Sequence, residues 1–257
     1  FDNLAPTALG WPRVGLYIPS GRNVPSDAAK VLRDLQVYHQ MPEVAIGRGC
    51  QLDMMRSRAG DALRRSKTLT HVLMLDDDHL HGTDVPNRLA RWVALFRHTE
   101  EPVEVVGGMN YRRTFPHQPC TWIDTREDDP WLGDRPPLVE SESKLAIPTS
   151  WEPGILMRAA IVGTGSLLIA KTVFDKLEFP AFYSPVEWVA GEPTRSFPGE
   201  DIGFAVKCRK AGIKQYCDPD CVSPHISEFV VDQRHFKLEN HLKYGQKTAP
   251  PESDCTT

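Results

Sequence analysis

The chain has 257 residues, of which 40% are hydrophobic and 25% are charged, and its formal net charge is −4. This length suits one large α/β domain or two small ones, and we expect a single domain with a long loop region. No apolar run approaches the length of a membrane span, the negative charge argues against a surface that coats nucleic acid, and the lack of a signal-peptide pattern leads us to expect a cytoplasmic protein.

Strands and helices are predicted to alternate through the first 108 residues. Apolar runs, helix caps and breaking residues predict strands at 13–18, 43–46, 72–75 and 103–106, with helices at 27–38, 53–67 and 85–97. This alternation favours right-handed parallel crossovers and therefore a mostly parallel central sheet flanked by helices. Ligands bind such sheets at the carboxyl ends of the strands.

Three adjacent aspartates, Asp76, Asp77 and Asp78, follow the apolar strand predicted at 72–75. A short, continuously apolar run suits a strand buried on both faces, so the acids lie where this strand would emerge. Because like charges repel, folding them together costs stability unless a cation or water separates them. Their oxygens suit Mg²⁺ or Mn²⁺, which in turn suit a diphosphate; the alternative is a solvated acidic turn leading to Gly82.

The helix predicted at 53–67 carries Arg56, Arg58, Arg64 and Arg65 and ends just before that strand. These basic residues could face a diphosphate. The simpler interpretation of each arginine is a solvated position, because amphipathic helices usually carry arginine on their wet side.

The segment from about 109 to 151 is rich in Pro, Trp, Asp and Arg and has no sustained period, which predicts a long irregular loop. Loops of this length inside a compact domain are usually functional or mobile. Its aromatic residues either stack on a sugar or base or bury a small core beneath the loop. They are Tyr111, Trp122, Trp131 and Trp151.

Regular patterns return after residue 151. The predicted elements are a strand at 160–169, a short helix at 172–177, a helix at 201–211, a last strand at 213–217 and a polar helix at about 228–244. Gly163 and Gly165 interrupt the first of these strands and let its backbone approach a ligand or a neighbouring strand. Pro219 is expected to end the last strand.

The six cysteines lack the density of a secreted disulfide scaffold, and we expect mostly free thiols. Cys217 and Cys221 have a spacing that could make half of a zinc site. No second pair of ligands completes it, so an ordinary structural role is favoured.

Two further polar groups stand beside predicted elements: Glu200-Asp201 at a helix start and His225 after the last strand. Each has an ordinary interpretation when taken alone. Carboxylates are favoured at a helix N-terminus, so the acidic pair could be a capping pair, and a single histidine is more often solvated or hydrogen-bonded than a ligand.

Taken in order, these segments resemble the GT-A glycosyltransferases, most closely the family 2-like enzymes that use nucleotide-sugar donors. The resemblance rests on the strand at 13–18 with its Pro19-Ser20-Gly21 exit, Asp76-Asp77-Asp78 as the Asp-x-Asp motif, the run at 163–169, the run at 199–204 with the helix after it, Asp218-Pro219 and His225. It leaves out the loop at 109–151 and the C-terminal tail. It implies one GT-A-like, Rossmann-like domain over 1–257, with a nucleotide-sugar-binding half at 1–108, an acceptor and catalytic half at 109–227, and a C-terminal helix and tail at 228–257.

The resemblance also implies roles for the matched residues. Asp78 and His225 would bind a Mn²⁺ or Mg²⁺ ion that bridges the donor diphosphate, and Asp76 would contact the ribose, or the metal through water. In inverting members the aspartate of the Glu-Asp pair is the catalytic base, which falls on Asp201, while Glu200 contacts the acceptor or orients the loop. The residues expected to contact the donor are Pro19, Ser20, Arg58, Asp76, Asp77 and Gly165.

One position departs from the family pattern. Arg58 lies where related enzymes have an Arg-Asn pair near the donor, but Ala59 occupies the position of the Asn. The role of Arg58 is therefore open.

We predict a metal-dependent glycosyltransferase that moves a sugar from a UDP- or GDP-sugar to an acceptor hydroxyl, with inversion and Asp201 as the base. The alternatives are a retaining enzyme of the same fold, a nucleotidyltransferase or phosphohydrolase, and a non-catalytic nucleotide-sugar-binding member of the fold. The acceptor is open among a glycan, a lipid, a protein, a small molecule and a modified base in DNA.

Overall fold

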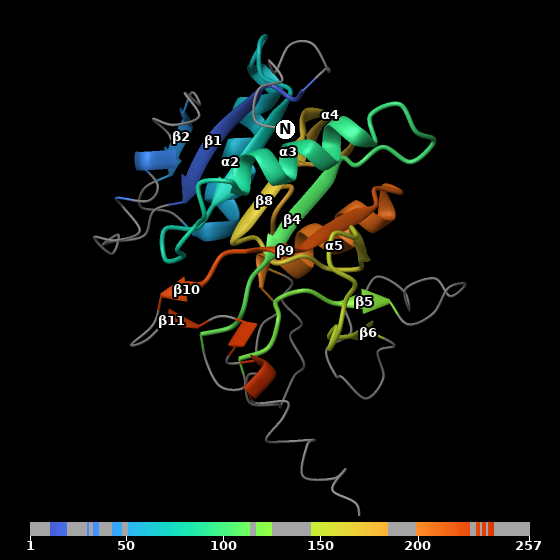
Figure 1. Cartoon of the computed structure of the whole chain (residues 1–257). Helices are drawn as coiled ribbons and strands as arrows, with labels where there is room; N and C mark the ends of the chain where they lie inside the picture. The colour runs from blue at the N-terminus through green and yellow to red at the C-terminus, as the bar shows by residue number, and fades with distance from the viewer. Residues whose placement is uncertain are drawn as a thin grey trace, which may run out of the picture.

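The structure, a computed structural model, describes residues 11–19, 30, 33–35, 43–47, 51–113, 117–124, 145–184, 199–226, 230–231, 233–234 and 236–238. In this part of the chain, helices cover both faces of a central sheet (Figure 1). The predicted fold class, α/β with a mostly parallel central sheet flanked by helices, is confirmed. None of the helices among the described residues is long and apolar enough to cross a membrane.

The central sheet has seven strands in the order β2-β1-β3-β8-β4-β9-β7. Their bounds are β1 Val14–Pro19, β2 Glu43–Gly47, β3 His71–Leu75, β4 Val105–Met109, β7 Met157–Ala159, β8 Ser166–Ala170 and β9 Gln215–Val222. Five strands, β2, β1, β3, β4 and β9, run in one direction, whereas β8 and β7 are antiparallel to their neighbours. The carboxyl ends of these five strands therefore lie at one end of the sheet, where open α/β sheets bind ligands.

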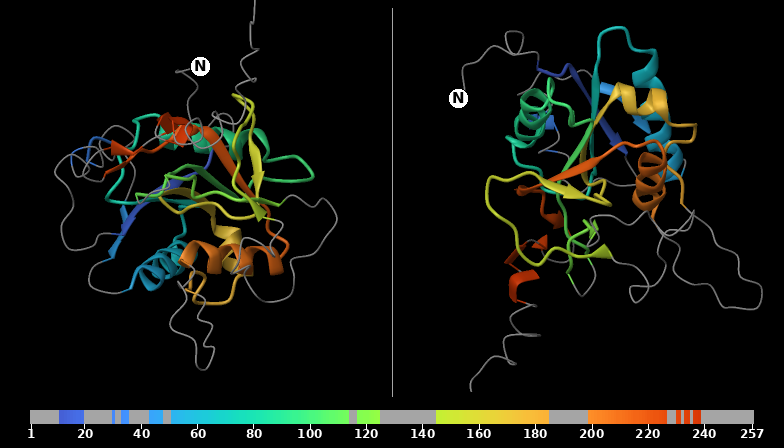
Figure 2. Two further views of the ribbon diagram at one scale, coloured as in Figure 1. Left: turned by 90° about the horizontal axis from the view of Figure 1, so that it is seen from below. Right: turned by 90° about the vertical axis from the view of Figure 1, so that its right-hand side faces the viewer.

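The helices divide between the two faces of the sheet. Their bounds are α2 Leu52–Arg65, α3 Val85–Leu95, α4 Lys171–Lys176 and α5 Glu200–Lys210. Figure 2 shows α3 on one face and α2, α4 and α5 on the other. Because successive side chains of a strand point to opposite faces, β3 supplies both cores: Leu73 and Leu75 pack on the α3 side, while Val72 and Met74 pack on the α2 side.

Most elements predicted for the first half are confirmed with small shifts of their ends, namely β1, β2, α2, β3, α3 and β4. Of the helix predicted at 27–38, residues 30 and 33–35 are helical, and the others lie outside the described residues. β4 begins two residues later than predicted and continues through Gly107 and Gly108. A Cβ at these positions would lie 2.5 Å from Val162 and 2.3 Å from Cys221, respectively, so only glycine lets the neighbouring segments approach so closely.

The strand predicted at 160–169 is wrong in its first half. β7 ends at Ala159 and pairs with β9 at one edge of the sheet, whereas β8 begins at Ser166 and lies between β3 and β4. The chain must cross from the edge to the centre between them, so residues 160–165 cannot continue a single strand. The insertion of β8 also separates β3 from β4, which the alternating sequence pattern did not indicate.

The predicted end of the last strand at Pro219 is also wrong, because β9 continues to Val222. The register between β4 and β9 jumps from Gly108 opposite Asp218 to Met109 opposite Val222. Pro219 thus lies in a bulge, where the ladder does not need its missing N–H.

The polar helix predicted from 228 does not begin there. A short strand, β11 (Val230–Val231), pairs with β10 (His225–Ile226), and residues 233–234 and 236–238 are helical. The remainder of the predicted helix lies outside the described residues.

The long segment predicted as irregular contains a small two-stranded sheet of β5 (Ile123–Asp124) and β6 (Leu145–Ala146). Tyr111 is buried with its ring 5.9 Å from that of Phe236, and Trp151 packs against the larger core. For these two aromatics the structure favours a role in the core over a stacking platform. Trp131 lies outside the described residues.

Candidate active site

The loop after β3 and the turn after β9 meet at the carboxyl end of the sheet. Backbone hydrogen bonds hold them together: the N–H of Leu80 donates to the carbonyl of Pro224, and the N–H of Ile226 donates to the carbonyl of Asp78, each at 2.8 Å. The side chains that follow the two strands are thereby brought face to face from distant parts of the sequence.

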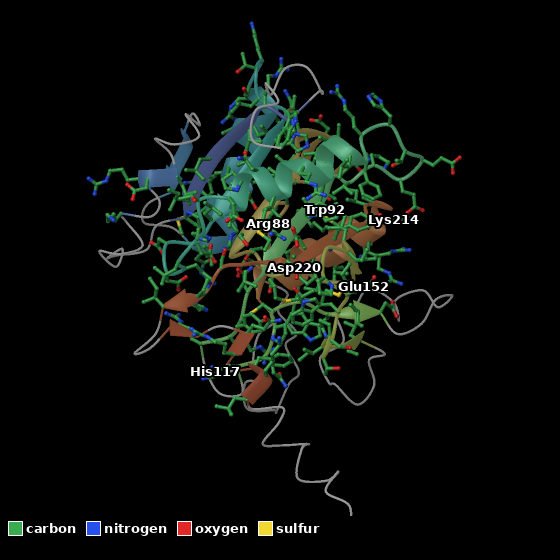
Figure 3. All side chains as sticks on the ribbon, in the orientation of Figure 1. Arg88, Trp92, His117, Glu152, Lys214 and Asp220 are labelled. Atoms are coloured by element: carbon green, nitrogen blue, oxygen red, sulfur yellow. The ribbon has the colours of Figure 1, made fainter. Side chains whose placement is uncertain are left out.

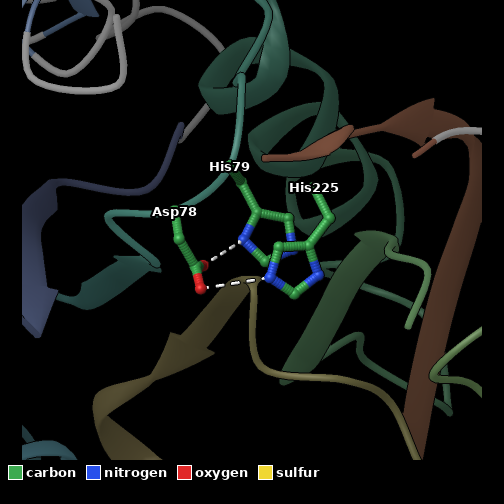
Figure 4. Close-up of side chains that lie close together, drawn as sticks. All are labelled: Asp78, His79 and His225. Carbon is green, nitrogen blue, oxygen red and sulfur yellow. Dashed lines mark hydrogen bonds and ion pairs between the residues drawn. The ribbon is translucent and has the colours of Figure 1, made fainter. Parts of the chain in front are cut away.

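The Asp78 carboxylate faces two stacked histidines, His79 and His225, at this meeting point (Figure 4). Its Oδ1 is 2.9 Å from Nδ1 of His79, its Oδ2 is 3.1 Å from Nε2 of His225, and the two imidazole rings stack with centroids 4.1 Å apart. The exposed Arg113 also approaches Oδ2, at 3.4 Å. Burial alone would raise the pKa of Asp78, but hydrogen bonds from His225 and His79 outweigh it and lower that pKa well below its ordinary value.

The surroundings of His225 decide which of its nitrogens carries the proton. Nδ1 lies 3.0 Å from the carbonyl oxygen of Tyr111, which only accepts hydrogen bonds, so Nδ1 is protonated. In the neutral ring, the lone pair of Nε2 then faces the carboxylate of Asp78. Two acceptors this close require a proton or a cation between them, and a backbone carbonyl that fixes the tautomer is the usual outer partner of a metal-binding histidine.

Together, Asp78, His79 and His225 form a cluster, called the Asp-His-His cluster below, whose candidate ligand atoms all lie within 4.8 Å of one another. One carboxylate and two imidazoles suit a divalent cation. The sequence pattern indicated Asp78 and His225 and missed His79. It also indicated Asp76 as a metal residue, but Asp76 is not part of this cluster and pairs with Arg56.

A second network surrounds Arg56 of α2. Its side chain is fully buried, and its two terminal nitrogens form ion pairs with Asp76 after β3 and with Glu200 at the start of α5. The hydroxyl of Thr164 also lies 3.4 Å from Glu200 Oε1. Arg56 therefore links the first aspartate of the acidic motif to the acidic pair on α5.

The expectation that Arg56 is solvated on the wet face of its helix is wrong. Met55, Ala59 and Leu63 form the buried stripe of α2, and Arg56 lies beside Met55 within it. Helical spacing could have revealed this position, because Arg56 is three residues before Ala59 and four before Gly60, both of which are buried.

Asp201 follows Glu200 in the first turn of α5. Its Oδ1 accepts a hydrogen bond from the N–H of Ile202 at 2.8 Å. Burial raises the pKa of Asp201 above its ordinary value, against the opposing effects of that hydrogen bond and of the Arg56 charge. The capping alternative thus describes part of the bonding of Asp201, whereas Glu200 is held by an arginine from another helix.

His81 fastens the acidic loop to the end of β9. Its Nε2 lies 2.9 Å from the carbonyl oxygen of Asp76 and its Nδ1 lies 2.9 Å from Oγ of Ser223. With both nitrogens bonded, the ring is a neutral spacer, and burial lowers its pKa to about 4.

The structure also places most of the other residues that are expected to contact a donor. Pro19 ends β1 and is buried, Arg58 is exposed on α2, and Asp77 is half-buried between its two neighbours. Ser20 lies outside the described residues.

The close neighbours of Gly165 explain why this position is a glycine. Its carbonyl accepts the N–H of Asp76 at 2.9 Å. A Cβ at this position would lie 2.9 Å from Nε2 of His79 and 2.9 Å from Oδ1 of Asn110. Glycine is therefore needed so that the start of β8 can lie against the histidine of the cluster.

A partly buried ion pair fixes the bulged end of β9, from which His225 follows. Arg88 of α3 donates to Asp218 at 3.2 Å, and Nε1 of Trp92 donates to the same carboxylate at 2.9 Å. Figure 3 shows Arg88 and Trp92 on α3 near Asp220, whose N–H donates to Asp218 at 3.1 Å. Three donors thus compensate the buried carboxylate.

The cysteines among the described residues are free thiols, as expected, whereas Cys50 and Cys255 lie outside those residues. Cys217 and Cys221 are buried, and burial raises the pKa of the Cys217 thiol to about 12 and that of Cys221 further. Because zinc binds the thiolate, these protonated thiols suit the structural role rather than half of a zinc site.

Comparison with known proteins yields structural likenesses alone. No protein-family model matches the chain, and no curated protein matches it. A crystal structure of A197 from STIV superposes with a TM-score of 0.53 at 19% identity, over 84% of this chain and 86% of that one. This likeness over most of both chains shows a shared fold.

Two further structures match with TM-scores below 0.5. One is a glycosyltransferase involved in the glycosylation of the major capsid of PBCV-1, with a TM-score of 0.27 at 12% identity over 63% of this chain and 62% of that one. The other is apo UDP-glucose pyrophosphorylase, with a TM-score of 0.38 at 10% identity over 91% and 82%. Scores this low do not establish a shared fold.

Proposed function

We propose that this protein is a metal-dependent glycosyltransferase that takes a sugar from a UDP- or GDP-sugar and transfers it to an acceptor hydroxyl with inversion. The observation that carries the proposal is the Arg56 bridge. It joins Asp76, two residues before the Asp-His-His cluster, to Glu200, the neighbour of Asp201. This bridge supports a single site at the carboxyl end of the sheet, in which the candidate cation site and the candidate base would act together.

The residues of the site divide the work of transfer. Asp78 and His225 would hold a Mn²⁺ or Mg²⁺ ion, which stabilises the negative charge of the departing nucleoside diphosphate. Asp76, which pairs with Arg56, would contact the ribose. The exposed guanidinium of Arg113, 3.4 Å from Asp78, is available to a phosphate oxygen once a cation occupies the carboxylate.

Asp201 is the proposed general base. Inversion needs a group that takes the proton of the acceptor hydroxyl on the face of the sugar opposite the leaving group. A base works best when its pKa approaches the working pH, and burial moves the pKa of Asp201 in that direction. Glu200 is held by Arg56 and acts by fixing the first turn of α5 beside the site.

The experiment uses water as the acceptor, because the natural acceptor is open. Release of nucleotide from a panel of UDP- and GDP-sugars is measured with and without Mn²⁺, and UDP and GDP binding is measured by calorimetry. We expect metal-dependent release in the parent, and in Asp201→Asn we expect unchanged nucleotide binding with release reduced at least about 100-fold.

Asp175→Asn is the matched control, since Asp175 is a half-exposed aspartate of α4 that pairs with Arg64. It should behave as the parent. If no nucleotide sugar binds or is hydrolysed, the glycosyltransferase proposal is wrong. If Asp201→Asn retains the parent rate, the inverting assignment is wrong.

A further inference from the structure

We propose that His79 is a third ligand of the cation site, and that the Asp-His-His cluster selects a transition-metal ion such as Mn²⁺, Co²⁺ or Zn²⁺ over Mg²⁺. The inference rests on the proposed function only in placing a cation at this cluster.

The bonding of His79 differs from that of a structural histidine. Its side chain is 4% exposed, Nδ1 lies 2.9 Å from Asp78 Oδ1, and Nε2 is buried with no hydrogen-bond partner among the described residues. His81, two residues further on and equally buried, has both nitrogens bonded, to Ser223 and to the Asp76 carbonyl. Burying Nε2 without a partner costs free energy, so the position of this ring depends on a favourable interaction at its other nitrogen, Nδ1, which faces Asp78.

The geometry around Asp78 fits a shared ion. Its two oxygens lie 2.9 and 3.1 Å from a nitrogen of His79 and a nitrogen of His225, respectively. Neighbouring ligands of an octahedral ion with bonds of about 2.1 Å are about 3.0 Å apart. The two rings stack with an interplanar angle of 22°, and each presents a nitrogen to the same carboxylate.

The outer environment of both histidines agrees with this assignment. The Tyr111 carbonyl holds the proton of His225 on Nδ1 and leaves Nε2 free to bind a metal. If His79 binds through Nδ1, its proton lies on Nε2. Nε2 adjoins the space where a Cβ of residue 165 would lie. Oδ1 of Asn110, which accepts hydrogen bonds, borders the same space.

The ligand chemistry gives the selectivity. Mg²⁺ prefers oxygen ligands and gives up its waters reluctantly, whereas imidazole nitrogen suits the later divalent metals. A site with one carboxylate alone would bind Mg²⁺ and Mn²⁺ with similar preference. Each imidazole added to it favours the transition metals, in the order Mn²⁺ below Co²⁺.

The first test measures binding of Mg²⁺, Mn²⁺ and Co²⁺ by calorimetry on the full chain without any nucleotide. The parent should bind Co²⁺ and Mn²⁺ at least about tenfold more tightly than Mg²⁺, and His79→Asn should weaken Co²⁺ binding by about tenfold or more while changing Mg²⁺ binding less. His98→Asn, a substitution of an exposed histidine after α3, is the matched control and should bind as the parent.

The second test needs no substitution and so is unaffected by misfolding of the variant. Pulsed electron paramagnetic resonance of bound Mn²⁺, with ¹⁴N- and ¹⁵N-labelled histidine, should show two coordinated imidazole nitrogens. A single coordinated imidazole, equal affinity for Mg²⁺ and Co²⁺, or no metal binding would overturn the inference. Two coordinated imidazoles in a protein that binds no nucleotide sugar would uphold it and refute the proposed function.

Discussion

Asp78 and His225 are 147 positions apart in the chain, and their side chains meet with Nε2 3.1 Å from Oδ2. Backbone hydrogen bonds between the two loops hold these two residues close together. The candidate cation site is therefore built by the segments that follow the carboxyl ends of β3 and β9, and its consequences can be tested one residue at a time.

Removing the carboxylate of Asp78 should abolish stabilisation by metal. We expect Mn²⁺ to raise the melting temperature of the parent, because an ion that binds only the folded state stabilises it by mass action. Asp78→Ala should show no such rise in differential scanning calorimetry, whereas Asp175→Ala, the control outside the site, should show the full rise. An undiminished rise in Asp78→Ala would place the metal elsewhere.

Arg56→Ala should destabilise the protein severely. The substitution leaves Asp76 and Glu200 as partly buried carboxylates without their shared counter-charge, and breaking a buried pair costs about 3–5 kcal/mol. Chemical denaturation would measure the loss. Arg64→Ala removes a surface arginine 3.5 Å from Asp175 and should cost less than about 1 kcal/mol.

Arg56→Lys distinguishes charge from geometry. Lysine keeps the positive charge but cannot bond two carboxylates with a planar fork. We expect this variant to recover part of the stability and little of the metal-dependent release of nucleotide. Recovery of both would mean that Arg56 acts by charge alone.

Gly165→Ala should weaken metal binding. The new methyl group would lie 2.9 Å from Nε2 of His79, so the ring has to shift from the position in which its Nδ1 faces Asp78. Gly212→Ala is the matched control: it forces alanine into a backbone with φ of 69°, which costs about 1 kcal/mol or more, at a site remote in sequence from the cluster. Calorimetric titration with Co²⁺ should show reduced affinity in Gly165→Ala alone.

Protonation of Asp201 should limit the activity at low pH. Its pKa in the folded protein is raised by burial, so the base is lost by protonation at a pH above that of an ordinary aspartate, and nucleotide release should fall as the pH drops through this value.

The raised pKa of Asp201 also affects how stability depends on pH. The folded state binds the proton more tightly than the unfolded state, so the parent should gain stability relative to Asp201→Asn as the pH falls through the raised pKa. Denaturation at each pH would measure this gain.

His71 should make the fold sensitive to mild acid. Burial lowers its pKa from 6.5 to about 4 at the start of β3. The folded state resists protonation of His71. The contribution of the neutral ring to the free energy of unfolding is therefore fully present above pH 6.5 and falls as the pH drops toward 4, by about 3 kcal/mol in all. Denaturation of His71→Gln at pH 7 and pH 4.5 should show a smaller decrease than the parent, and His98→Gln should match the parent.

The sequence alone determined the local elements and the class of the fold. The continuous apolar run of β3 and the apolar stripes of α2 and α3 reflect burial of those segments, and burial patterns of this kind repeat with the period of the element itself. Once these local elements are predicted, the residues at their ends are placed as well. The aspartates could therefore be predicted at the end of β3, and Glu200 and Asp201 at the start of α5.

Only the tertiary structure decided which distant segments meet. The insertion of β8 between β3 and β4, and the passage of β9 through Pro219, depend on pairing with strands far away in sequence, which no local pattern encodes. The same holds for the site. Arg56 is buried because Asp76 and Glu200 neutralise it, and His225 faces Asp78 because the loops after β3 and β9 are joined. A charged or polar residue is buried only where its partners converge, and that convergence is a property of the folded chain.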